Sequence, residues 1–411
     1  MSSAGPMRPP RVLALLGPAF VAAIAYVDPG NVAANLSAGS TYGYALVWVL
    51  VAASVIAVVV QYLSARLGLV TGRSLATLVS EHLASHHGVW RVAYALQAYV
   101  MAIATDLAEV IGGALGLTLL FQTPLWLGGL IVGVVTLILL PLMRSRGEIV
   151  FERAVVVVIV LIAVAFLAGL VWAPPDPIRT LAGLIPWVPD TKAWFLVAAM
   201  VGATVMPHAV YLHSALAVDR FHRSGTRVAP IERLLRIQRT DVLAALALAG
   251  TVNIAMLLYA ARALSGLQGD TIQEAHRMLN ATLGPVAAAF LGAGLLASGI
   301  GSAIVGTHAG SGIASDSFPI RVSPAVTRAV TIAPAVLLLL GGVPATAVLV
   351  ASQVVLSFGI GFAVAPLVWL SSREDVMGSW RISGWLRFVA WAVVVVIVML
   401  NLVLVATWFM P

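Results

Sequence analysis

The sequence predicts an all-α polytopic membrane protein with eleven transmembrane helices, and composition and hydropathy carry that prediction. Of the 411 residues, 61% are hydrophobic and only 9% are charged, whereas a soluble domain carries about 25% charged residues. A soluble fold could not cover so much apolar surface with so few charges. The chain also contains repeated apolar stretches that reach the roughly 20 residues needed to cross the hydrocarbon core of a bilayer.

This length criterion predicts eleven membrane spans along the chain. They lie at residues 12–38, 44–70, 89–120, 123–143, 153–173, 192–218, 238–264, 284–310, 323–342, 346–371 and 383–409. Arg8 and Arg11 precede an apolar run and superficially resemble the start of a signal peptide. No convincing cleavage site follows them, so we expect this segment to be a retained first helix.

The basic residues predict the orientation of these spans. With a cytoplasmic N-terminus, 19 of the 23 Lys and Arg residues fall in the N-terminal tail, in the loops after even-numbered spans or at the adjoining span ends. The other four are Arg179, Lys192, Arg262 and Arg277. The positive-inside rule therefore predicts an inner (plasma) membrane protein with a cytoplasmic N-terminus and an external C-terminus.

Charge and cysteine content exclude several classes of partner. The net charge of +7 comes from basic residues scattered through short loops, which is not the clustered pattern of a nucleic-acid-binding face. The chain contains no Cys, so it has no disulfide framework, thiolate metal site or Cys nucleophile.

A proline-rich linker divides the first ten spans into two sets of five. The linker is Ala173-Pro174-Pro175-Asp176-Pro177, and each set begins with a span interrupted by proline. An odd number of helices per repeat places the two sets in opposite orientations, which predicts a 5+5 inverted repeat plus one extra helix. Within a single transmembrane domain over 1–411, repeat one covers about 12–173, repeat two about 192–371 and the extra helix about 383–409.

The two proline interruptions occupy corresponding places in the two repeats. They are Asp28-Pro29-Gly30-Asn31 and Met206-Pro207-His208. Proline removes a backbone donor and glycine lets the chain leave helical geometry, and the freed carbonyls cannot face lipid. A carboxylate at a span centre costs about 2.5–3.5 kcal/mol on insertion scales, which a simple proline kink would not require. Paired broken helices predict a substrate site near the bilayer midplane.

The residue types at these breaks favour a divalent cation. Carboxylate, amide and carbonyl oxygens suit hard or borderline ions, and the thioether of Met206 is preferred by softer transition metals. The mixed set therefore indicates Mn²⁺, Fe²⁺, Co²⁺ or Cd²⁺. A lone methionine is more often core filler, but the position of Met206 directly before Pro207 favours a ligand.

The two motifs closely resemble the signature helices of the Nramp metal transporters, whose bacterial members are proton-coupled manganese importers. The matching segments are Asp28-Pro29-Gly30-Asn31, Gly202-Ala203-Thr204-Val205-Met206-Pro207-His208, Tyr211-Leu212-His213-Ser214, Ala297-Ser298-Gly299 and Ser352-Gln353-Val354-Val355-Leu356-Ser357. The resemblance implies a LeuT-type fold with spans 1 and 6 unwound at the site. It implies proton-coupled import of divalent metal, mainly Mn²⁺, by alternating access in the bilayer, with no cofactor and no obligate protein partner.

The resemblance also implies specific metal ligands. Asp28 and Asn31 would bind the ion, Met206 would donate its sulfur, and the carbonyl of Ala203 and side chain of Gln353 would complete the shell. Three places depart from the usual family pattern. They are Ala209-Val210 in place of Asn-Leu, Ser311 in place of Gln after Gly310, and Gly359-Ile360-Gly361-Phe362 in place of Gln-Leu-Pro-Phe. These departures affect the expected gating and leave the metal ligands intact.

A second ionisable group lies in spans 3 and 9. Asp106 and Glu109 are three residues apart and so share one helix face. Arg328 could pair with them structurally, but two acids and one arginine leave a surplus carboxylate, and such groups often mark a proton route. The resemblance implies the same route, from Asp28 through these acids to the cytosol. His208 could titrate near neutral pH and take part, or it could be structural.

Other motifs receive structural interpretations. His213 is expected to be structural, and His308 has no assigned role. Glu81, His82 and His86 have a helical spacing that could hold a metal, but we interpret them as part of a polar connector. The small-residue pairs are expected to bring helices into close contact; they are Gly112 with Gly116 and Gly129 with Gly133.

Three alternative functions remain open from the residues. A sodium-coupled amino-acid symporter of the same fold would place helix N-termini at a substrate carboxylate, which an anionic Asp28 would oppose. A membrane enzyme lacks support, because no His-Glu-x-x-His motif or Gly-x-Ser-x-Gly elbow occurs. A channel would be excluded by uptake that saturates and counter-transports.

Overall fold

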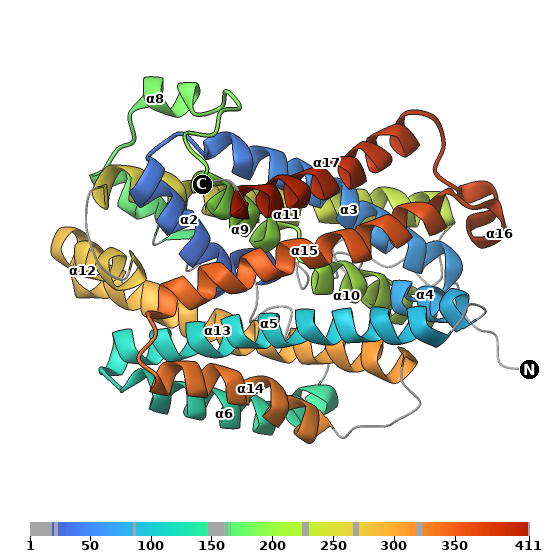
Figure 1. The fold of residues 1–411 in the computed structure, drawn as a ribbon, viewed down its shortest axis with the longest axis horizontal. Helices are drawn as coiled ribbons and strands as arrows, with labels where there is room; N and C mark the ends of the chain where they lie inside the picture. Colours follow the sequence, from blue (N-terminus) through green and yellow to red (C-terminus); the bar gives the residue numbers. More distant parts are fainter. Residues whose placement is uncertain are drawn as a thin grey trace, which may run out of the picture.

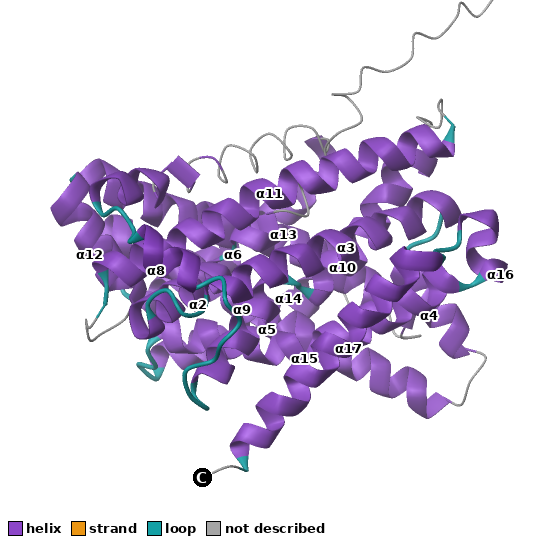
Figure 2. Cartoon of the chain, turned by 90° about the horizontal axis from the view of Figure 1, so that it is seen from above, coloured by secondary structure: helices purple, strands orange, loops and turns teal. Residues whose placement is uncertain are grey.

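Helices form all the regular structure in the described part of the chain, which contains no strand (Figure 2). The computed structural model describes residues 24–84, 88–146, 166–223, 230–265, 271–317 and 324–409, together with positions 19, 160, 163 and 164. Among these residues, seven helical stretches are long and apolar enough to cross a membrane, which agrees with an integral membrane protein.

The helices follow one another in the order that the hydropathy predicts. The first group is η2 (Ile24–Val27, a 3-10 turn), α2 (Pro29–Tyr42), α3 (Val47–Thr71), α4 (Leu75–Ala84), α5 (Gly88–Phe121) and α6 (Leu125–Arg146). The second group is α8 (Pro177–Ala182), α9 (Ala193–Thr204), α10 (Pro207–Val218), η3 (Asp219–Arg223, a π-helical turn), α11 (Ile231–Ala263), α12 (Thr271–Leu283), α13 (Pro285–Ser317), α14 (Pro324–Leu340) and α15 (Ala345–Ser372). The chain then forms α16 (Glu374–Met377), η4 (Gly378–Trp380) and α17 (Gly384–Trp408).

Several elements differ from the predicted organisation, among them α4 and α11. The connector that carries Glu81 and His82 is itself a helix, α4, because Leu75, Leu78 and Val79 bury one of its faces. The seventh span was predicted at 238–264, but α11 begins at Ile231. Its first turns bury an apolar face at the end of α3, while the charged residues of the same turns remain more exposed.

The predicted count of eleven helices stays a prediction. Parts of two predicted spans lie outside the described residues, namely 12–18 and 20–23 of the first span and 153–159, 161–162 and 165 of the fifth. The other predicted spans each coincide with described helices. The 192–218 span is divided between α9 and α10.

Loops that the sequence assigns to the same side of the membrane meet at one end of the bundle. Figure 1 shows α8 and α12 at one end of the long helices and α4 and α16 at the other. At the first end, Tyr42 donates a hydrogen bond to the carboxylate of Asp190 over 2.8 Å. Trp48 donates to the carbonyl of Trp187 over 3.0 Å.

Hydrogen bonds also join the connectors at the opposite end of the bundle. Arg66 of α3 donates to the carbonyl of Trp380 over 2.7 Å, and the His222 Nε2 lies 2.8 Å from the carbonyl of Leu69. The connectors after the second, sixth and tenth predicted spans therefore lie together, as the alternation of spans requires.

The centre of the bundle depends on very close helix contacts. α5 and α13 lie side by side (Figure 1). A Cβ at Gly116 would press into the backbone of Gly292 and Leu296, and a Cβ at Gly299 would press into the backbone of Glu109 and Gly113. These contacts confirm the predicted packing role of Gly116, because only glycine lets two backbones approach this closely.

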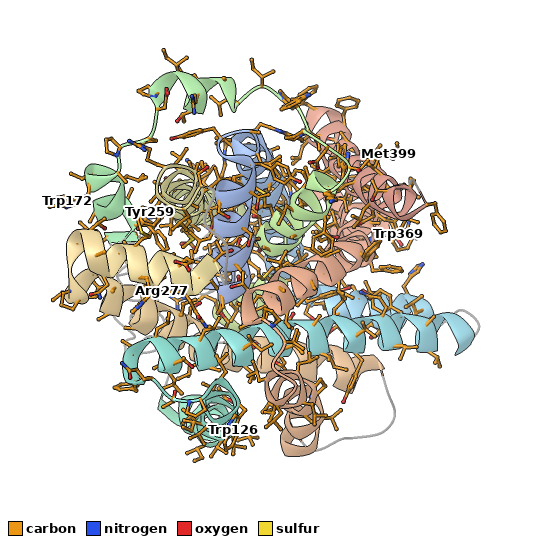
Figure 3. All side chains as sticks on the ribbon, turned by 60° about the vertical axis from the view of Figure 1, so that its left-hand side comes forward. Trp126, Trp172, Tyr259, Arg277, Trp369 and Met399 are labelled. Carbon is orange, nitrogen blue, oxygen red and sulfur yellow. The ribbon has the colours of Figure 1, made fainter. Side chains whose placement is uncertain are left out.

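Apolar side chains also cover much of the outside of the bundle. Trp126, Trp172 and Met399 project from different helices around its circumference, whereas Tyr259 is buried (Figure 3). An outer surface of this kind is suited to contact with lipid acyl chains rather than water.

Candidate metal-binding site

The first break of the chain is organised by Asp28. Pro29 and Gly30 begin α2, and Asp28 is its N-cap residue with an extended backbone. Proline is favoured in the first helical turn because its missing N–H would have no intrahelical partner there. The Asp28 Oδ1 accepts hydrogen bonds from the Asn31 backbone N–H over 2.7 Å and from its side-chain amide over 2.8 Å. Asp28 is buried, with 3% of its surface exposed.

The second break separates α9 from α10. α9 ends at Thr204 and α10 begins at Pro207, with Val205 and Met206 between them outside helical geometry. Because proline has no N–H, it cannot donate to the carbonyl four residues earlier. That carbonyl belongs to Ala203, so a second partner can reach it. Met206 is the N-cap residue of α10 and is fully buried.

A hydrogen bond joins the two breaks directly. The Asn31 side-chain amide donates to the Ala203 carbonyl over 2.8 Å. The same amide donates to Asp28, so the structure brings the carboxylate, the amide and the freed carbonyl to one buried point. Met206 follows three residues after Ala203 and, as the N-cap residue of α10, belongs to the same break.

Gln353 of α15 packs against both breaks. A Cβ added at Gly30 would overlap the Gln353 side chain, and one added at Gly202 would overlap its carbonyl. The Gln353 Nε2 donates to the Ser352 hydroxyl over 3.3 Å. Its Oε1 is buried and accepts no hydrogen bond from the described part of the chain. A buried acceptor without a donor costs about 1–3 kcal/mol, and this oxygen is therefore available to a cation.

The charge pattern of the site favours a cation with modest affinity. Asp28 contributes one carboxylate, and the partial negative charge at the C-terminal end of α9 adds to it. The described residues contain no group of three or more His, Cys, Asp or Glu side chains that could hold a metal. Neutral oxygens and a thioether around a single carboxylate bind an ion less tightly than a cage of several carboxylates, because ligand charge sets affinity.

Helix α5, which contains the two predicted acids, packs against the first break. Asp106 and Glu109 are both buried, and a Cβ at Gly112 would overlap the Pro29 ring. The His208 Nδ1 lies 3.2 Å from the hydroxyl of Thr105. His208, which follows the second break, therefore contacts α5 one residue before Asp106.

Some predicted positions lie outside the part of the chain whose side chains are described. They are Arg328, His308, Ser311 and His86. In the described part of α4, Glu81 forms an ion pair with Arg73, and the His82 ring packs edge-on against Trp369 with ring centroids 4.5 Å apart. Both contacts agree with the structural interpretation of this segment.

His213 lies in a buried polar chain that runs through Gln61 to Tyr26. Its Nδ1 is 2.7 Å from the Gln61 Oε1 and its Nε2 is 3.0 Å from the Gln238 Nε2. Gln61 in turn donates to the Tyr26 hydroxyl over 2.5 Å. Both ring nitrogens of His213 are thus engaged, which agrees with the expected structural role.

Sequence reasoning did not single out Thr105, Gln61 or Asn253. The only signal for them is a polar side chain inside an apolar span. That signal marks a residue that needs a partner, but it does not identify the partner.

Comparison with known proteins identifies the family. Residues 19–407 match the family described as Nramp, Natural resistance-associated macrophage protein-like. The chain belongs to the Nramp family. It is 49% identical over 396 residues to the divalent metal cation transporter MntH of Mycobacterium tuberculosis, covering 95% of this chain and 91% of that protein. The family membership expected from the two motifs is confirmed.

Solved structures agree with this assignment. The manganese transporter of Eremococcus coleocola, in complex with an aromatic bis-isothiourea substituted compound, superposes with a TM-score of 0.83 and 26% identity, covering 97% of this chain and 88% of that one. Mhp1, a nucleobase-cation-symport-1 family transporter, shares the fold with a TM-score of 0.60 and 17% identity, covering 99% and 93%. This Nramp chain therefore has the helical fold of the LeuT-like transporters.

Proposed function

We propose that this Nramp protein imports divalent transition metal ions, mainly Mn²⁺ and also Fe²⁺, Co²⁺ and Cd²⁺, together with protons. The observation that carries the proposal is the hydrogen bond from Asn31 to the Ala203 carbonyl, which draws the two helix breaks together beside Asp28. The oxygen atoms gathered there suit a divalent ion. The similarity to transporters named for divalent metal and for manganese supports the same substrate class.

The proposed ligands are Asp28, Asn31, the Ala203 carbonyl, Met206 and Gln353. Asp28 supplies the charge and the neutral oxygens replace part of the hydration shell. The Met206 thioether favours softer transition metals over Ca²⁺ and Mg²⁺, which prefer all-oxygen shells. The buried Gln353 Oε1, which has no donor in the described part of the chain, supports its place in the shell.

We also propose a proton route that leaves the metal site along α5. Asp28 and His208 lie at its start, Asp106 and Glu109 continue it, and Arg328 tunes the acids. The contact between His208 and Thr105 supports the first step of this route, because it holds the imidazole against α5. Buried carboxylates inside membrane helices are the usual elements of such relays.

We propose that the chain has eleven spans, arranged as a 5+5 inverted repeat over about 12–371 with an extra helix at about 383–409. This arrangement would allow alternating access to the site. Spans 1 and 6 would be unwound at the site and would hinge there to open it to either face. The distribution of basic residues supports a cytoplasmic N-terminus and an external C-terminus in the inner (plasma) membrane.

An amino-acid symporter on the same fold is disfavoured by the first break. Such a transporter holds the substrate carboxylate at a helix N-terminus. In this chain the Asp28 carboxylate already accepts the N–H of Asn31 at the start of α2, and it would repel a second carboxylate.

Uptake into proteoliposomes tests the proposed function. We expect saturable uptake of Mn²⁺ and Cd²⁺ driven by an inward proton gradient, with acidification of the vesicle interior recorded in parallel. Metal ions, and not amino acids, should raise the melting temperature of the purified protein, since a ligand stabilises the state that binds it. Amino-acid-dependent stabilisation without a metal effect would contradict the proposal, and uptake that does not saturate would indicate a channel.

A further inference from the structure

The two carbonyls immediately before the first break have lost their helical donors. In a continuous helix, the carbonyls of Tyr26 and Val27 would accept from the N–H groups of Gly30 and Asn31. The Asn31 N–H instead donates to the Asp28 carboxylate over 2.7 Å. Buried carbonyls need a donor, so the backbone before Asp28 requires hydrogen bonds from elsewhere in the fold.

Asn253 of α11 supplies the first of these donors. Its Nδ2 donates to the carbonyl of Tyr26 over 2.8 Å, and its Oδ1 accepts a hydrogen bond from Asn35 over 3.0 Å. Tyr26 precedes the break and Asn35 belongs to α2 beyond it, so one side chain holds both parts of the broken helix. Asn253 is only 1% exposed, and water has little access to these bonds.

Ser298 of α13 supplies the second donor. Its hydroxyl donates to the carbonyl of Val27 over 2.9 Å, and Ser298 is also buried. Val27 is the residue directly before Asp28. Two different helices, α11 and α13, therefore hold the two peptide groups that lead into the carboxylate.

We propose that Asn253 and Ser298 are positioning residues for the metal site. Their side chains fix the non-helical backbone before Asp28, so that its carboxylate is held at the Asn31 amide and beside the Ala203 carbonyl. Without these donors the two carbonyls adopt other orientations, and part of the binding energy is consumed in ordering Asp28. The inference rests on the proposed function, because it names residues that set the affinity of the same site.

Metal binding to purified protein separates this role from a general contribution to folding. Ser298→Ala removes one hydroxyl, and Asn253→Leu keeps a side chain of similar size without hydrogen bonds. We expect Ser298→Ala to weaken the Kd for Mn²⁺, measured by isothermal titration calorimetry, about tenfold, as follows from losing one buried hydrogen bond. Asn253→Leu loses two such bonds and should weaken the Kd at least as much. Ser298→Thr retains the hydroxyl and should bind Mn²⁺ with wild-type affinity.

Matched controls lie on the same two helices. Ser302→Ala changes a buried serine one turn further along α13. Thr251→Val changes a residue of α11 whose hydroxyl bonds to the Ala247 carbonyl of its own helix. Both should bind Mn²⁺ with wild-type affinity, and the metal-free melting temperature of every variant shows whether it is folded.

The outcomes are distinguishable. Wild-type affinity in folded Ser298→Ala would overturn the inference, even if Asn253→Leu failed to fold. Equal weakening in Ser302→Ala would also overturn it, because the effect would then be general to α13. If the wild-type protein bound no Mn²⁺, the proposed function itself would fail, whatever the variants did.

Discussion

The side-chain amide of Asn31 lies 2.8 Å from the backbone carbonyl of Ala203, although 172 positions separate them in the chain. The same amide donates to the Asp28 carboxylate. The two oxygens that accept these bonds are proposed metal ligands, so an incoming ion competes with the amide protons for them. Metal binding would therefore require the Asn31 amide to turn its oxygen toward the ion.

Asp28→Asn should abolish metal transport. The substitution keeps the shape of the side chain but removes the only carboxylate among the proposed ligands, and ligand charge dominates affinity for a hard or borderline ion. We expect Mn²⁺ uptake into proteoliposomes to fall to background. Asp176→Asn is a suitable control because Asp176 caps α8, which lies at one end of the bundle (Figure 1). Substantial residual uptake by Asp28→Asn would remove Asp28 from the ligand set.

Met206→Ala should change selectivity rather than abolish transport. Loss of the thioether removes a ligand that only the softer ions prefer, so Ca²⁺ or Mg²⁺ should compete better with Mn²⁺ for uptake. The comparison is Met200→Ala, since Met200 is equally buried but lies within α9. It should lower the melting temperature and leave discrimination between ions unchanged. An unchanged preference in Met206→Ala would contradict the role given to sulfur.

Gly30→Ala should weaken metal binding by displacing Gln353. An added Cβ overlaps the Gln353 side chain, and that flexible side chain must move out of the site. Gly361→Ala, on the same helix as Gln353, has no atom within 4 Å of the added Cβ. It should bind Mn²⁺ normally and gain about 0.5–1 kcal/mol of helix stability. Calorimetric titration and thermal melting of both variants test this, and equal Kd values would count against Gln353 as a ligand.

Tyr42→Phe should lower stability at neutral pH and have less effect in acid. The hydrogen bond from Tyr42, assisted by the Ala193 N–H, holds the pKa of Asp190 below its ordinary value of 3.8. A carboxyl group whose pKa is lowered in the folded protein stabilises the fold at pH values above its ordinary pKa. This contribution is lost as the pH falls through the lowered pKa. Burial and the nearby Asp190 raise the pKa of Tyr42 to about 12, so the tyrosine remains a donor at neutral pH.

The measurement for this pair is the melting temperature as a function of pH. Tyr42→Phe should melt earlier than wild type at neutral pH, and the difference should shrink as pH falls below 3.8, the ordinary Asp value. Tyr44→Phe is the matched control, because the Tyr44 hydroxyl accepts the backbone N–H of Asp176 over 3.1 Å, and among the described residues no carboxylate side chain bonds to it. A constant difference at all pH values would show that Asp190 is not responsible.

Local chemistry explains why many features of this protein can be predicted from its amino-acid sequence. Long apolar stretches specify membrane helices, and a proline breaks its own helix wherever that helix packs. Pro207 therefore frees a carbonyl about one turn before it, and the resemblance to the Nramp transporters implies that this carbonyl belongs to Ala203. The side chains of Asp28 and Met206 likewise indicate a mixed oxygen and sulfur ligand set. The family match confirms the resemblance of the motifs that contain them to the Nramp family.

The partners of these groups could not be read from the chain. A buried polar atom must find a partner, but helix packing selects it from positions far away in sequence. Helix packing alone determines three such contacts: the hydrogen bond of Asn31 to Ala203, the packing of Gln353 on Gly30, and the hydrogen bond of Ser298 to Val27. The helix breaks are local properties of proline and glycine, whereas the site they form exists only because distant helices pack across them.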